Sequence, residues 1–147
     1  VPTLTQTRDK AKEGVRHGAY VLVDTEGTPD VIIMATGSEV QHAVAAADTL
    51  KGEGINARVV SFPSMEWFEQ QDEDYKESVL PSDVAARVSV EAGLAMPWYR
   101  YLGSYGKAIS IEQFGLQGDG QENMKALGIT PEHIVDAAKA SIEEARR

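Results

Sequence analysis

Cysteine is absent from this sequence of 147 residues, and cations are scarce, with 14 lysines and arginines against 23 aspartates and glutamates. The lack of cysteine excludes disulfides, thiolate catalysis and cysteine-ligated zinc, and it favours a reducing compartment. The formal net charge of −9 disfavours binding to nucleic acids or to anionic membranes, because both need clustered cations. The apolar runs are too short to span a bilayer, and no signal-peptide pattern opens the chain. We therefore expect a soluble, cytoplasmic protein with no nucleic-acid or membrane partner.

The length of the sequence suits one domain, and its hydrophobic content of 42% is enough for a core. Residues 1–17 begin with Val-Pro, are polar and charged, and lack clear periodicity. Such a stretch is typical of a linker from a preceding domain. We therefore expect residues 18–147 to form one domain of a longer polypeptide.

The hydrophobic pattern changes its period several times along the chain. Runs of strand-forming residues predict strands at 19–24, 30–36, 57–62, 86–93 and 108–115. Helices are predicted over about 39–51, once or twice within 63–81, as a short aromatic helix or loop at 96–103, and at 118–128 and 130–147. Thr130 and Pro131 give the last helix an N-cap and a proline at its first position.

The order of these elements predicts an α/β fold, a three-layer α/β/α sandwich. Its sheet has about five strands and is mostly parallel, with one antiparallel edge strand. The strand–helix–strand segment over 30–62 predicts a parallel pair with a right-handed crossover. The short connection at residues 25–29 predicts that the first two strands form an antiparallel hairpin.

Several of the predicted strands end in turn-like sequence. The carboxyl ends of parallel strands lie on one edge of a sheet, and open α/β sheets usually bind ligands there. The candidate ligand or interface edge consists of Thr36, Gly37, Ser38, Ser64, Glu91, Gly93 and Gly115. The pattern leaves open whether this edge binds a small ligand or a neighbouring domain.

The tetrapeptide Thr36-Gly37-Ser38-Glu39 lies between a strand and a helix, where many α/β proteins bind a phosphate. It lacks the spaced glycines and the lysine of phosphate-binding motifs, and it does not match a nucleophile elbow. Ser38 and Gln41 match a capping box, and Glu39 suits the positive end of the helix dipole. We expect a helix cap here, with anion binding as the alternative.

The spacing of polar residues shows no acid–base pair, nucleophile–base pair or metal cluster. His17, His42 and His133 are far apart in the sequence, and we expect them at the surface. Glu91 ends a buried strand, where a carboxylate is either salt-bridged at an interface or catalytic, and we expect the interface. The aromatic segment 96–103 either packs in the core or anchors a protein interface.

Longer segments resemble the C-terminal domain of transketolase. The resemblance runs in one order from about Gly18 to the end, and its most specific parts are "ATGSEV", "ARVVSFPS", "YKESVLP", "VEAG" and "LGITPEHIVDAAK". One segment departs from the family pattern, because "LQGDGQENMKALG" at 116–128 replaces a small-residue turn. There, Asp119 and Glu122 can cap a helix instead.

Transketolases transfer a two-carbon ketol unit from a ketose phosphate to an aldose phosphate in the pentose phosphate pathway. They are homodimers that use thiamine diphosphate and a divalent metal, Mg or Ca. The resemblance implies that this chain is the C-terminal domain of such an enzyme, with a structural and dimer-supporting role. It also implies that no catalytic, cofactor-binding or metal residue lies in this domain, which would be inactive alone. Its partners would be the other domains and the second subunit of the parent enzyme.

Two alternatives stay open. The chain could be a regulatory module that binds a small ligand at the strand-end edge. It could also be the equivalent domain of another thiamine diphosphate enzyme, such as a deoxyxylulose phosphate synthase or a two-oxoacid dehydrogenase.

Overall fold

The computed structural model describes residues 14–91, 98–110 and 129–147. In chain order the elements are β1 (Tyr20–Val23), β2 (Val31–Ala35), the 3₁₀ turn η1 (Gly37–Glu39), α2 (Val40–Gly52), β3 (Ala57–Ser61), α3 (Met65–Glu69), α4 (Glu73–Val79), β4 (Arg87–Glu91), α5 (Tyr99–Leu102), β5 (Lys107–Ser110) and α7 (Pro131–Ala145). The helix predicted at 118–128, with Asp119 and Glu122, lies outside the described residues, as does most of the predicted linker.

The described strands form a five-stranded sheet in the order β1-β3-β2-β4-β5. Strand β2 pairs in parallel with both β3 and β4, and β5 pairs in parallel with β4. Strand β1 lies at one edge and runs antiparallel to β3. All five residues of β2 are buried, as a central strand covered on both faces requires. The predicted fold class is confirmed.

The predicted hairpin between the first two strands is wrong. Tyr20 of β1 lies opposite Ser61 of β3, so β3 separates β1 from β2. A short connection favours local pairing, but the all-apolar β2 must be buried in the middle of the sheet. Its two edges are therefore taken by parallel partners from later in the sequence, and the half-buried β1 takes the outer position.

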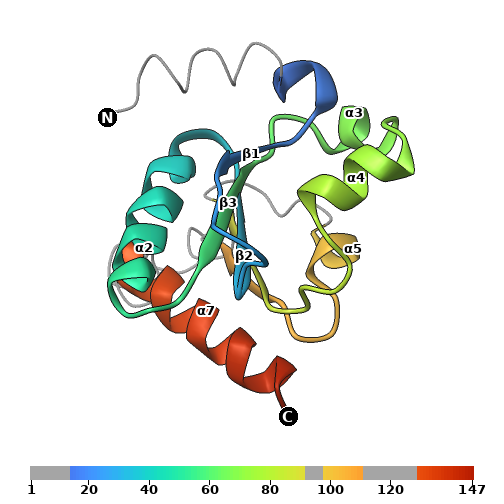
Figure 1. Ribbon diagram of the computed structural model, residues 1–147. Coiled ribbons are helices and arrows are strands. Elements are labelled where there is room, and N and C mark those ends of the chain that lie inside the picture. Colours follow the sequence, from blue (N-terminus) through green and yellow to red (C-terminus); the bar gives the residue numbers. More distant parts are fainter. Residues whose placement is uncertain (1–13, 92–97, 111–128) are drawn as a thin grey trace.

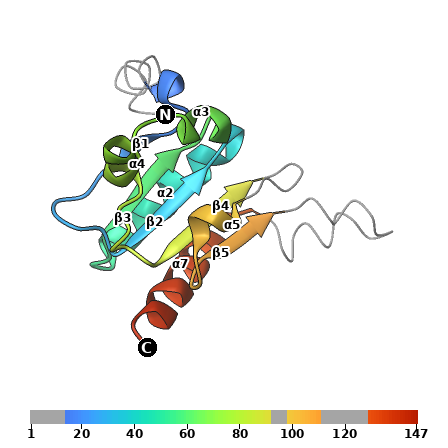
Figure 2. The same ribbon diagram turned by 90° about the vertical axis from the view of Figure 1, so that its right-hand side faces the viewer.

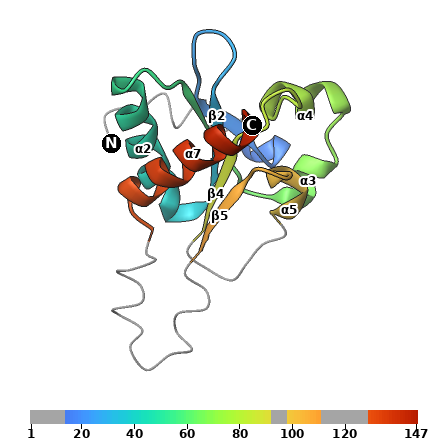
Figure 3. The ribbon, with the colours of Figure 1, turned by 90° about the horizontal axis from the view of Figure 1, so that it is seen from below.

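Helices cover both faces of the sheet (Figures 1 and 3). Helices α2 and α7 pack on one face, whose core includes Ile33, Leu50, Val59, Val88 and Ile134. Helices α3, α4 and α5 pack on the other, whose core includes Ile32, Met34, Phe62, Phe68 and Trp98. Neighbours along β2 serve opposite cores because successive strand residues point to opposite faces. In the described part of the chain, we find no helix with the length and apolar character to cross a membrane.

Among the helices that the structure describes, three begin on side-chain caps, which satisfy backbone N–H groups that have no partner within the helix. Ser64 accepts from the backbone N of Trp67 at the start of α3, at 3.1 Å. Asp72 does the same for α4. The cap predicted at Thr130 is confirmed, since its Oγ1 accepts from the backbone N of His133 at 3.2 Å.

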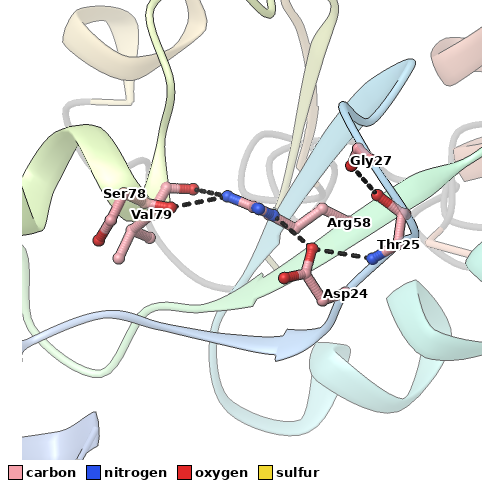
Figure 4. Close-up of polar contacts among 6 residues, drawn as sticks. All are labelled: Asp24, Thr25, Gly27, Arg58, Ser78 and Val79. Carbon is pink, nitrogen blue, oxygen red and sulfur yellow. Dashed lines mark hydrogen bonds and ion pairs between the residues drawn. The ribbon is translucent and has the colours of Figure 1, made fainter.

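Arg58 of β3 joins the end of α4 to the loop after β1 (Figure 4). Its Nη1 donates to the carbonyls of Ser78, at 2.8 Å, and Val79, at 3.0 Å. Its Nε donates to Oδ1 of Asp24 at 3.0 Å. The last carbonyls of a helix lack partners within the helix and carry partial negative charge, so a guanidinium satisfies both needs.

Arg87 of β4 binds the next part of the same connection. Its guanidinium donates to the carbonyls of Pro81 (2.9 Å), Val84 (3.0 Å), Tyr101 (2.8 Å) and, at 3.4 Å, Leu80. Burial lowers the pKa of Arg87 below its ordinary value. One side chain therefore holds both the α4–β4 connection and the end of α5.

Arg58 and Arg87 occupy matching positions in the sheet. Ile32 of β2 is in register with Arg58 on one side and with Arg87 on the other. Residues in register on neighbouring strands point to the same face, which here is the face covered by α3, α4 and α5. Segment 78–84 is thus bound by two guanidinium groups on the same level of the sheet.

We expect Arg87→Met to lower the free energy of unfolding by about 3 kcal/mol, because several carbonyls would lose a charged donor. Urea denaturation followed by circular dichroism measures this change. The control is Arg146→Met, since Arg146 is 71% exposed in its side chain and exposed ion pairs contribute about 1 kcal/mol or less. Equal losses in the two variants would show that the carbonyl contacts of Arg87 contribute little.

Candidate functional site

The carboxyl ends of β2, β3 and β4 lie together at one edge of the sheet (Figure 2). This strand-end edge brings together five of the predicted residues, Thr36, Gly37, Ser38, Ser64 and Glu91. Gly93 and Gly115 lie outside the described residues. After β2 the chain crosses to β3 over one face, and after β4 it passes to α5 on the other face. The ends of β2 and β4 therefore flank the topological switch point, where open sheets usually bind ligands.

The capping box predicted for Ser38 and Gln41 is wrong. Thr36 is the N-cap residue of η1, and among the described residues no side-chain oxygen caps η1 or α2. Gly37 has a φ of 60°, a left-handed value that suits glycine. This conformation turns the chain directly from β2 into η1, so Ser38 lies inside the helical turn rather than before it.

Glu39 is the buried acid of this turn, with 9% of its surface exposed. Its Oε1 accepts a hydrogen bond from the Ser38 hydroxyl at 3.3 Å. Its Oε2 is buried and has no hydrogen-bond donor within the part of the chain that the structure describes. The Nε2 of His42 lies 3.7 Å from this oxygen. A buried carboxylate oxygen without a donor carries an uncompensated desolvation cost.

No pattern in the sequence predicts the burial of Glu39, which the helix-dipole argument placed in an ordinary first turn. The available signal is Gly37, which follows the all-apolar β2 after one residue and indicates a sharp turn. Burial also depends on β4, which lies against η1. A hairpin with β1 and a crossover to β3 would occupy both sides of β2. The predicted pairing therefore left no place for β4 beside β2.

Glu91 has a partner inside the domain. It is buried, and its Oε1 accepts from the indole Nε1 of Trp98 at 2.8 Å. Trp98 and Tyr101 are both buried and pack around Phe62, with ring centroids 5.2 and 5.0 Å away. These two aromatic residues therefore belong to the core, and the indole orients the carboxylate at the end of β4.

The three histidines are half-buried rather than fully exposed. His17 stacks on Tyr75 with 4.5 Å between ring centroids. His42 lies on α2 and His133 in the first turn of α7. Among the described residues, no group of acids and histidines could hold a metal ion.

The chain enters the domain at the same strand-end edge. The carbonyl of Gly18 accepts from the backbone N of Ser64 at 2.9 Å, and the Tyr75 hydroxyl donates to the Ala19 carbonyl at 2.7 Å. Gly18 has a φ of 83°, and a side chain there would collide with the backbone of Ser64 and Phe68. Residues just before β1 are therefore fixed beside the end of β3 (Figure 2).

Tyr101 reaches from the core to an acid on α3. Its hydroxyl donates to Oε2 of Glu69 at 2.6 Å, and Lys76 and Arg100 lie 3.7 and 3.6 Å from the other oxygen of that carboxylate. Burial, and then the hydrogen bond to Glu69, raises the pKa of Tyr101 above its ordinary value.

The raised pKa makes stability depend on Tyr101 at alkaline pH. The unfolded chain loses the phenol proton at about pH 10 while the folded chain keeps it, so the free energy of unfolding falls as the pH rises above about 10. We expect Tyr101→Phe to remove this part of the fall. Urea denaturation between about pH 8 and 11 would show the two curves converging. Tyr99→Phe is the control, since Tyr99 is 86% exposed, and parallel curves for Tyr101→Phe would contradict the expectation.

The fold defines a class, three-layer α/β/α domains with a mostly parallel sheet and an antiparallel edge strand. A family model described as the transketolase-like TK C-terminal domain matches residues 18–130. The chain belongs to this family, and the resemblance seen in the sequence is confirmed.

The relatives are much longer than this chain. It is 46% identical to the transketolase of Halalkalibacterium halodurans over 143 residues, which are 97% of this chain and 22% of that protein. It is 48% identical to transketolase 2 of Escherichia coli over 133 residues, 90% of this chain and 20% of that one. A solved structure, the transketolase from Leishmania mexicana, is similar with a TM-score of 0.77 and 39% identity, over 90% of this chain and 19% of that chain. The chain thus spans about a fifth of their length.

Proposed function

We propose that this chain acts as the C-terminal domain of a transketolase that transfers a two-carbon ketol unit from a ketose phosphate to an aldose phosphate. The observation that carries the proposal is the similarity to transketolases over 97% of this chain but only 22% of the relative's length. The parent enzyme would hold thiamine diphosphate and a divalent metal in its other domains. The sequence without cysteine supports a cytoplasmic location.

The role of the domain itself is structural. Several polar side chains of the strand-end edge help to hold the fold, which supports this role. Ser64 caps α3, and Glu91 accepts from Trp98. The Ser38 hydroxyl donates to Glu39. The Nε2 of His42 lies 3.7 Å from the other carboxylate oxygen of Glu39. A general acid or base must instead reach the reacting atoms of a substrate.

The partners in this proposal are the preceding domains of the same polypeptide and a second copy of it. A domain of this size has room on its surface for both, and Ser64 of the strand-end edge lies next to the point where the chain enters. An interface between domains of one chain is typically more polar than a permanent dimer interface, which suits this edge.

A chimera tests the proposal. Residues 18–147 would replace the matching domain of Escherichia coli transketolase 2, to which the chain is 48% identical. With thiamine diphosphate and Mg²⁺ we expect the chimera to transfer ketol units between sugar phosphates in a coupled assay. We expect the 147-residue chain alone to show no transfer above background.

The truncated relative without its last domain serves as the matched control for the chimera. A chimera no more active than this control would overturn the proposal. Ketol transfer or tight thiamine diphosphate binding by the 147-residue chain alone would overturn the structural role.

A further inference from the structure

Glu39 lies at the strand-end edge, and one of its carboxylate oxygens lacks a hydrogen-bond donor among the described residues. Its Oε2 has no donor among the described residues although it is buried, and buried polar atoms of native proteins nearly always have one. The acid is held in place from the other side, by Ser38 at Oε1. The orientation of the carboxylate is thus fixed while half of its hydrogen-bonding capacity stays unused.

The side chain next to this oxygen is partly exposed. His42 is one helical turn along from Glu39, and 35% of its side chain is exposed. Gly37, Ser38 and Gln41 around it are exposed as well. A group approaching this edge from outside the domain would meet backbone, a hydroxyl and the imidazole before the carboxylate.

The chain enters the domain at this same edge. Gly18 is locked against Ser64 at the end of β3, and β1 leads away from that end. The polypeptide before β1 therefore arrives at the strand-end edge. The family match begins at residue 18, and about four-fifths of the relative's length lies outside the matched part. A preceding domain would therefore be connected to this one beside the end of β3.

Charge favours a basic group on that preceding domain. The sequence has a formal net charge of −9, and in the described part of the chain Glu39 pairs with no lysine or arginine. A buried carboxylate is best compensated by a cationic donor, whose hydrogen bonds are shorter and stronger than neutral ones.

The domain also has a hollow at the opposite end of the strands, but its charged groups are not left without partners. It has a volume of about 400 Å³ and is lined in part by Asp30, Lys139 and Arg146. Its charges already have partners in the domain, since Arg146 lies 3.7 Å from Asp30 and Lys139 lies 2.5 Å from Glu53. The hollow also lies at the amino ends of β2 and β3, away from where the chain enters.

We propose that Glu39 is an interdomain contact, which accepts a hydrogen bond from a cationic side chain of the domain that precedes this one. The inference rests on the proposed function, because it needs the preceding domains of a transketolase. In the assembled chain Oε2 of Glu39 receives its donor and His42 turns toward the new surface. The strand-end edge is then an interface between domains rather than a pocket for a small ligand.

Hydrogen exchange on the chimera described above tests this contact. The amides of residues 37–42 should exchange roughly tenfold more slowly in the chimera than in the 147-residue chain, because an interface suppresses local opening. In the chimera with Glu39→Gln, the extra protection should be lost. Asp48→Asn is the matched control, since Asp48 is an exposed acid on α2, and it should keep the protection.

Four results would overturn the inference. The first is equal exchange of residues 37–42 in the chimera and the 147-residue chain. The second is full protection in the Glu39→Gln chimera. The third is unfolding of the 147-residue chain by Glu39→Gln, seen by circular dichroism, because the acid would then serve the domain itself. Protection of the 147-residue chain by millimolar inorganic phosphate would also overturn it, by assigning the edge to a small anion.

The same chimera separates this inference from the proposed function. Ketol transfer by a chimera whose residues 37–42 are unprotected would overturn the interdomain contact alone. A chimera that protects these amides through Glu39 but transfers no ketol unit would support the contact and overturn the proposed activity.

Discussion

The backbone of β2 pairs with strands on both sides while its side chains are buried on both faces, and this double burial constrains the rest of the chain. Two parallel partners need two crossovers, and crossovers are right-handed. The chain leaves β2 in one direction through α2 to β3, then returns past β2 through α3 and α4 to β4. Opposite directions with one handedness place the helices on opposite faces, so the three layers follow from one strand.

The connection from β3 past β2 to β4 leaves backbone groups without partners in a helix or the sheet, because α3 and α4 are short and the segment from α4 to β4 is irregular. Arg58 and Arg87 solve this locally. They stand on either side of Ile32 and bind the carbonyls of segment 78–84. Backbone that cannot join a helix or the sheet is thereby hydrogen-bonded, as buried backbone requires. The same two side chains complete the cover over the second core.

Local patterns predicted what depends on local physics. The apolar run of β2, the helical spacing in α2 and the Thr130 cap predicted the element types. The order of strands and helices predicted the fold class and the edge of the sheet on which Ser64 and Glu91 both lie. The hairpin prediction failed because the partner of β1 lies more than thirty residues away in the sequence. The capping box failed because the φ of Gly37 is not encoded in a spacing rule. Predicting the burial of Glu39 would have required both the correct strand pairing and the turn at Gly37.

Strand β1 has a consequence for how the domain behaves among other copies of itself. It is the outer strand on its side of the sheet, it has four residues, and its register with β3 shifts between Val21 and Val23. A long, flat outer strand is a template on which further strands add, whereas a short and irregular one is a poor template. The outer edge at β1 therefore protects the domain against aggregation through the addition of strands from other copies.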